Sequence, residues 1–137
     1  MHNQIGPISS GQRLVLMRLR EGPLLLCSFT DPSDAKEPKG MLITDGWGQP
    51  RRVFGLFGAI SEDDGKTWPH IRLITMTDPG DGQVLTGGAW TGQFVMDRTH
   101  AEPSGYLCAT QTPDGVIHLL SSAVHYQFNL AWARSRP

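Results

Sequence analysis

Short runs of apolar or alternating residues follow one another along the chain, and turn-forming residues bound each run. Runs of about four to eight residues rich in Val, Ile, Leu, Thr and Phe are typical of β-strands. No window carries the spacing of a capped amphipathic helix. The pattern therefore predicts an all-β protein without a helix and with about nine strands, at residues 13–19, 24–30, 41–44, 52–61, 71–75, 93–96, 107–112, 116–121 and 128–133.

Glycine, proline and aspartate mark the turns between these runs. Gly22-Pro23 separates the first two strands, and Pro113-Asp114-Gly115 separates two later ones. Because Pro presets φ and Gly adopts positive φ, both segments predict β-hairpins. Residues 77–91 are rich in Gly and Asp and predict one long surface loop. His125-Tyr126 is placed in a loop between the last two strands.

The composition fits many short strands joined by tight turns in a single domain over residues 1–137. There are 16 Gly and 10 Pro, with 39% hydrophobic and 18% charged residues. A net charge of −1 offers no attraction for nucleic acid or an anionic membrane, so neither is an expected partner. No apolar run approaches the roughly 18 residues of a membrane span, and no signal-peptide pattern opens the chain, so we expect a soluble protein. Cys27 and Cys108 are expected to be reduced, buried thiols.

Residues 61–68 match the Asp-box pattern S-x-D-x-G-x-T-W at every fixed position. Asp63 can accept hydrogen bonds from backbone N–H groups of its own turn, and Gly65 supplies a positive φ. Thr67 begins the outgoing strand, and Trp68 brings a large apolar surface that fastens the turn to the sheet. The box, formed by Ser61 and these four residues, therefore predicts a structural turn, with Asp63 outside any catalytic role.

With this box, the chain resembles the C-terminal part of sialidase-like proteins built from bacterial neuraminidase repeats. Residues 109–121 are similar to the first two strands of a blade in those proteins, with a P-D-G turn followed by Ile-His-Leu. The resemblance covers residues 12–134 but only part of the family's length. It implies antiparallel four-stranded blades of a six-bladed β-propeller, in which the Asp-box joins the third and fourth strands and lies away from the active site.

One chain of this length cannot close such a propeller. A blade takes about 40–50 residues, so the chain would supply two blades, or three at most. We expect one blade-like unit at 13–75 and a second at 93–133 that lacks a strand. Open blade faces and unpaired edges favour self-association. A homotrimer would complete six blades, and a dimer is the second alternative.

The resemblance also implies a sialic-acid-type glycan as ligand, gripped by three Arg and attacked by a Tyr paired with a Glu. The family's N-terminal Arg motif is missing here, so the catalytic residues stay unassigned and a complete set is not expected in one chain. Polar and aromatic residues near the predicted strands at 107–112 and 116–121 are the candidate pocket residues: Arg98, His100, Glu102, Tyr106, His125 and Tyr126. The alternatives are a solvated polar loop at 97–106 with Tyr106 in the core, and simple packing for Tyr126.

Other chemistries lack their signatures. His100-x-Glu102 begins the zinc-deaminase pattern, but no P-C-x-x-C follows, and the five His show no zinc spacing. No cofactor or metal is therefore predicted. The sequence predicts a glycan-recognising module that acts as an oligomer, with Trp47, Trp90 and Tyr126 able to stack on sugar rings. Glycoside hydrolysis would need a site assembled across chains. The alternative is a non-catalytic structural or protein-binding oligomer.

Overall fold

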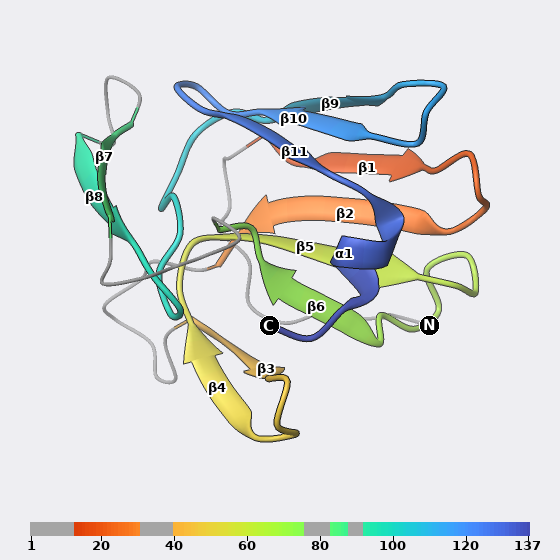
Figure 1. Ribbon diagram of the computed structural model, residues 1–137, viewed down its shortest axis with the longest axis horizontal. Helices are drawn as coiled ribbons and strands as arrows, with labels where there is room; N and C mark the ends of the chain where they lie inside the picture. The colour runs from red at the N-terminus through yellow and green to blue at the C-terminus, as the bar shows by residue number, and fades with distance from the viewer. Residues whose placement is uncertain (1–12, 31–39, 76–82, 88–91) are drawn as a thin grey trace.

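The computed structural model describes residues 13–30, 40–75, 83–87 and 92–137, and every structural statement below concerns these ranges. The described chain is all-β apart from one short helix, which confirms the all-β class with antiparallel sheets, while the propeller stays a prediction (Figure 1). Its elements are β1 (Val15–Arg18), β2 (Leu24–Phe29), β3 (Met41–Thr44), β4 (Pro50–Val53), β5 (Leu56–Ser61), β6 (His70–Leu73), β7 (Gln83–Thr86), β8 (Gln93–Met96), β9 (Cys108–Gln111), β10 (Ile117–Leu120), β11 (His125–Phe128) and α1 (Leu130–Arg134).

The largest sheet is four-stranded and antiparallel, in the order β1-β2-β5-β6. Its central strands β2 and β5 are buried almost throughout, and a strand covered on both faces has a continuous apolar sequence. Between them the chain leaves the sheet to form the β3–β4 hairpin and then returns. The sheet lies within residues 13–75, and the Asp-box turn connects its third and fourth strands, β5 and β6.

The predicted long strand at 52–61 is wrong, because Gly55 divides it into β4 and β5. Gly55 has a φ of 109°, and a Cβ there would lie 2.6 Å from the carbonyl oxygen of Ala101. Its N–H donates to Thr30 Oγ1 at 2.8 Å, and its carbonyl accepts from the Thr30 N–H at 3.1 Å. A residue without a side chain therefore lets β5 begin directly against the segment that carries Glu102.

A second antiparallel sheet has three strands, in the order β11-β10-β9. The predicted Pro113-Asp114-Gly115 hairpin between β9 and β10 is confirmed: Gly115 has a φ of 89°, and its N–H donates to the Thr112 carbonyl at 2.9 Å. The loop expected at His125-Tyr126 is wrong, because both residues belong to β11 and pair with β10. The alternation of exposed and buried positions in β11 is too short to stand out in the sequence.

The remaining described strands form two separate hairpins. Part of the long loop predicted at 77–91 is strand β7, which pairs antiparallel with β8. The predicted strand at 93–96 therefore belongs to this hairpin and does not extend the β9–β11 sheet. None of the four described sheets closes on itself.

The last predicted strand, 128–133, is also wrong, because the chain turns into α1 after Phe128. The Asn129 side chain accepts a hydrogen bond from the Trp132 N–H at 2.9 Å, which is the standard N-cap arrangement. Leu130 and Ala133, three residues apart, are buried on one face of the helix. The helix packs against β5 and β6 (Figure 1).

Both cysteines are free, as expected, but only Cys27 is buried. Burial raises the pKa of the Cys27 thiol well above its usual range, so it packs as a small hydrophobic residue. Cys108 is exposed at the start of β9, the edge strand of its sheet, which corrects the expectation that it is buried.

Candidate functional site

The Asp-box forms a closed network of hydrogen bonds around Asp63. Asp63 Oδ1 accepts from the Thr67 N–H at 2.8 Å, and Oδ2 accepts from Thr67 Oγ1 at 2.6 Å. Ser61 Oγ donates to Asp63 Oδ1 at 2.8 Å and accepts from the Gly65 N–H at 2.8 Å. Gly65 has a φ of 88°, and Trp68 packs against the core. The side-chain oxygens of Ser61, Asp63 and Thr67 are thus used within the turn.

These hydrogen bonds also set the charge state of Asp63. The Thr67 hydroxyl and N–H lower the pKa of the carboxyl from 3.8 to about 2. A carboxylate held by its own turn has no free oxygen for a substrate. The geometry therefore makes Asp63 a brace between β5 and β6.

Two of the candidate pocket residues lie together on the turn after β8, away from the others. The His100 ring stacks on Phe54 with 5.2 Å between centroids, and its Nδ1 lies 3.2 Å from Asp97 Oδ1. The guanidinium of Arg98 lies 5.9 Å from the centre of the exposed Trp47 ring. Trp90 lies outside the described residues.

Tyr106 is a third candidate pocket residue, and it is 65% exposed. Its backbone forms an isolated parallel bridge with Arg13, just before β1, and its N–H donates to Ser122 Oγ at 3.2 Å. The alternative that placed Tyr106 in the core is therefore wrong.

Glu102 and Tyr126 are the two candidates that the fold brings into direct contact. The Tyr126 hydroxyl donates to Glu102 Oε1 at 2.8 Å, although the residues belong to different segments. Glu102 is fully buried, and its Oε2 has no hydrogen-bond partner within the described residues. Burial, followed by the contact with Glu102, raises the pKa of Tyr126 well above its usual range. The phenol therefore keeps its proton, and the Tyr126 ring lines the surface beside β11.

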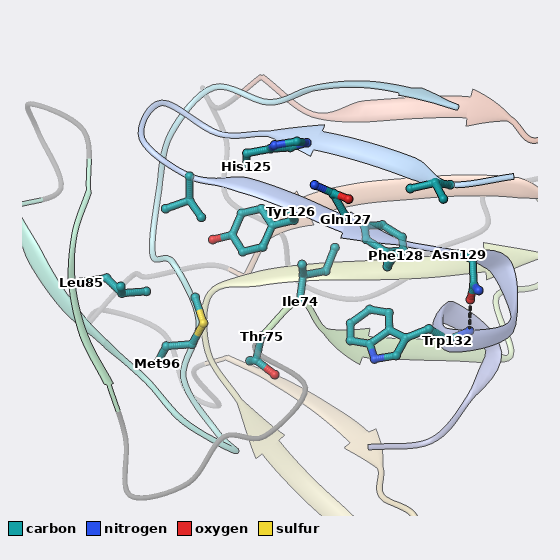
Figure 2. A pocket seen from close by; sticks show the side chains of 12 residues that line it. Ile74, Thr75, Leu85, Met96, His125, Tyr126, Gln127, Phe128, Asn129 and Trp132 are labelled. Carbon is teal, nitrogen blue, oxygen red and sulfur yellow. Dashed lines mark hydrogen bonds between the residues drawn. The ribbon is translucent and has the colours of Figure 1, made fainter. Parts of the chain in front are cut away.

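That surface is an open groove with a volume of about 620 Å³ (Figure 2). It lies between β11 and the β7–β8 hairpin, and α1 closes one end. The apolar and aromatic lining side chains are Ile74, Leu85, Met96, Val116, Val124, Tyr126, Phe128 and Trp132. The polar lining residues are Thr75, His125, Gln127 and Asn129, and the side chains of His125 and Gln127 point to the other face of β11.

Arg72 fixes the orientation of Trp132 in this groove. Its guanidinium lies 3.6 Å from the centre of the Trp132 ring, and its Nη1 donates to Ser135 Oγ at 2.6 Å and to the Trp132 carbonyl at 3.1 Å. Burial lowers the pKa of Arg72 to about 10, so the guanidinium stays charged at neutral pH. Because Arg72 covers one ring face, Trp132 has only its other face and edges to offer to the groove, beside Thr75 and Asn129 (Figure 2).

Sequence reasoning found His125 and Tyr126 but missed most of the groove. Trp132 was assigned to a strand, and Arg72 was not a candidate. Asn129 followed by Leu130 and Ala133 is a helix-start signal that could have been recognised. Leu85 and Met96 reach the groove only through tertiary packing, for which the sequence carries no local signal.

The described residues lack two further features. No group of three or more His, Cys, Asp or Glu side chains is arranged to hold a metal ion there. No helix in the described part of the chain is long and apolar enough to cross a membrane. In comparisons with known proteins, no protein-family model, no curated protein and no solved structure shows a significant match to the chain.

Proposed function

We propose that the chain is a glycan-recognising module of the sialidase-like Asp-box type, and that the groove beside β11 and α1 is its sugar-binding site. The observation that carries this proposal is the mixed lining of the groove around Trp132. Sugar rings present apolar C–H faces and polar hydroxyl rims, so their sites combine an aromatic face with amide, hydroxyl and imidazole groups. The groove supplies Trp132, Phe128 and the Tyr126 ring together with Thr75 and Asn129, while His125 and Gln127 face the other side of β11.

The size of the groove agrees with this ligand class. Small-molecule sites typically occupy about 300–1,000 Å³, and a volume of about 620 Å³ accommodates one or two sugar rings. The Trp132 ring is held in place by Arg72, so little side-chain entropy is lost when a ligand stacks on it.

Tryptophan fluorescence during titration with 3′-sialyllactose and with lactose tests the proposal. We expect saturable binding to wild type and at least about tenfold weaker binding to Trp132→Ala. Trp47→Ala is the matched control, because Trp47 is 72% exposed and does not line the groove. Wild-type affinity in Trp132→Ala, or loss of binding only in Trp47→Ala, would contradict the proposal.

Glycoside hydrolysis is the second candidate, and the Tyr126–Glu102 pair favours it. A Tyr paired with a Glu is the nucleophile that the sialidase resemblance implies, and the two side chains meet at 2.8 Å. The raised pKa of Tyr126 opposes this role, because a phenol that retains its proton is a poor nucleophile. Release of a fluorophore from a sialoside, lost in Tyr126→Phe, would support hydrolysis, whereas no release above background would exclude it for this substrate.

We also propose that the chain self-associates through the unpaired edges of its sheets. The strands β1 and β9 are edge strands, and Leu14 and Leu16 beside the β1 edge are 42% and 59% exposed. Exposed edge strands that carry apolar side chains favour pairing with another chain. Light scattering on a sizing column tests this directly: a mass near three times 15.1 kDa supports the six-bladed trimer, and a stable monomer refutes self-association.

A further inference from the structure

Two histidines on neighbouring strands meet on the face of the β10–β11 pair opposite the buried Leu119 and Tyr126. His118 is on β10 and His125 is on β11, diagonally across the pair, since the register places His118 opposite Gln127 and His125 opposite Leu120. Their rings are inclined by 24°, with 5.3 Å between centroids, and His118 Nδ1 lies 3.1 Å from His125 Nε2. The two rings therefore make their closest polar contact through one nitrogen of each.

The surroundings determine which nitrogen of His118 carries the proton. The Thr112 hydroxyl donates to the Asp114 carboxylate and lies 3.4 Å from His118 Nε2. Because the hydroxyl proton is directed to Asp114 or to the Val116 carbonyl, Thr112 Oγ1 can accept from His118 Nε2, and this contact favours the tautomer that is protonated there. The lone pair of His118 Nδ1 then points to His125 Nε2, which donates the hydrogen bond. A histidine whose second nitrogen is fixed by an oxygen has the arrangement found behind metal-binding imidazoles.

The separation of the two nitrogens suits a single metal ion. With metal–nitrogen bonds of about 2.0–2.1 Å, ligand angles between octahedral and tetrahedral place two imidazole nitrogens roughly 2.9–3.4 Å apart. The observed 3.1 Å lies within that range. On metal binding the hydrogen bond between the rings is lost, and both rings turn so that the lone pairs of His118 Nδ1 and His125 Nε2 converge on an ion to one side of the line that joins them. The proton of His125 then moves from Nε2 to Nδ1, so both ligands stay neutral imidazoles.

We propose that His118 and His125 form a two-ligand site for a late first-row divalent cation of the Zn²⁺, Ni²⁺ or Cu²⁺ class. Imidazole nitrogen is a preferred ligand of these ions. The Asp114 carboxylate adds favourable charge behind His118: hydrogen bonds from the Thr112 hydroxyl and the Val116 N–H lower its pKa and keep it ionised. No third His, Cys, Asp or Glu joins the pair within the described residues, so water molecules complete the coordination.

Calorimetric titration of the full chain with ZnCl₂ and with NiCl₂ tests the proposal without any sugar present. We expect one ion per chain and at least about tenfold weaker binding in either His118→Ala or His125→Ala, because one imidazole cannot chelate. Thr112→Val should weaken binding by a smaller factor than either histidine variant, because it removes only an outer-shell contact to His118 Nε2 and leaves both ligands in place. His100→Ala is the matched control: its ring is also exposed and lies beside a carboxylate, but it has no histidine neighbour in the described residues.

A second measurement on wild type does not depend on the variants folding. Imidazole ¹⁵N resonances should report metal binding at His118 Nδ1 and His125 Nε2, and no change at His100. Absence of heat and of imidazole shifts at millimolar metal would overturn the site. Binding that survives in the His118→Ala/His125→Ala double variant would overturn it equally, since the ion would then be held elsewhere.

Discussion

The Asp-box turn and the Glu102–Tyr126 contact each join a carboxylate to a hydroxyl, but they stabilise the molecule in different ways. Asp63 binds Thr67, four residues away, and both of its oxygens accept hydrogen bonds on a solvent-facing turn. Glu102 binds Tyr126, 24 residues away, and its second oxygen has no partner in the described structure. The first contact forms within its own segment, whereas the second exists only when β11 has docked on the segment before β9. A substitution should therefore lower the free energy of unfolding only slightly at the Asp-box and much more beneath the groove.

The largest difference in the free energy of unfolding should come from a Gly→Ala substitution made in each of the two regions. Gly55→Ala forces a side chain into positive φ and places its Cβ 2.6 Å from the Ala101 carbonyl, next to Glu102. Backbone strain and overpacking together should reduce the free energy of unfolding by at least about 3 kcal/mol. Gly65→Ala has positive φ but no contact closer than 3.7 Å, and should cost only about 1–2 kcal/mol. Urea denaturation of both variants checks this, and equal losses would refute the contrast.

Removal of the Tyr126 hydroxyl should have the next largest effect. Tyr126→Phe keeps the ring but leaves a buried carboxyl without its hydrogen-bond donor, which should cost about 1–3 kcal/mol. Tyr106→Phe is the control, and its exposed hydroxyl predicts no loss in thermal denaturation. Because the pKa of Tyr126 is raised in the folded state, its contribution is present below pH 10 and is lost at higher pH. A Tyr126→Phe variant as stable as wild type would show that the hydrogen bond to Glu102 does not stabilise the fold.

The effect of Asp63→Asn on thermal stability should be smaller and should depend on pH. Its pKa falls from 3.8 to about 2 on folding, so the carboxylate stabilises the fold above pH 4 and loses this contribution as the pH falls towards 2. We expect the variant to melt roughly a few degrees lower at pH 7, with the difference shrinking through that window.

Asp64→Asn is the control in the same turn. Asp64 has a φ of 60°, which Asn tolerates, and its ion pair with Arg18 is exposed, so the melting temperature should not change. Equal melting curves for wild type and Asp63→Asn at every pH would refute the role given to the box.

The smallest effect should follow Trp47→Ala. Trp47 is 72% exposed on the β3–β4 turn, and its ring contacts Arg98 only at 5.9 Å. Surface changes of this kind usually stay within about 0.5 kcal/mol. A larger loss in urea denaturation would show that this turn belongs to the cooperative core.

The sequence predicted what depends on neighbouring residues and missed what depends on tertiary contact. The Asp-box turn, the Pro113-Asp114-Gly115 hairpin and the all-β class follow from local pattern, because turn chemistry and strand alternation act over a few residues. The break at Gly55 was missed because it depends on the close approach of the Ala101 backbone, which lies far along the chain. The pairing of β8 with β7 was missed because a segment rich in Gly and Asp does not predict a strand.

The candidate site divides in the same way. Glu102 and Tyr126 were found because polar and aromatic residues cluster near predicted strands, yet their contact could not be foreseen. Trp132 was missed because a helix of five residues is too short to show a period. Its position depends on Arg72, sixty residues earlier.

The central claim, that the groove beside β11 and α1 receives a sugar, is tested most directly by NMR titration of the wild-type chain with 3′-sialyllactose. We expect saturable shifts of the Trp132 indole N–H and of the Asn129 side-chain amide, while the Trp47 indole and the backbone of the Asp-box stay unchanged. Shifts confined to Trp47, or none at millimolar sugar, would contradict it.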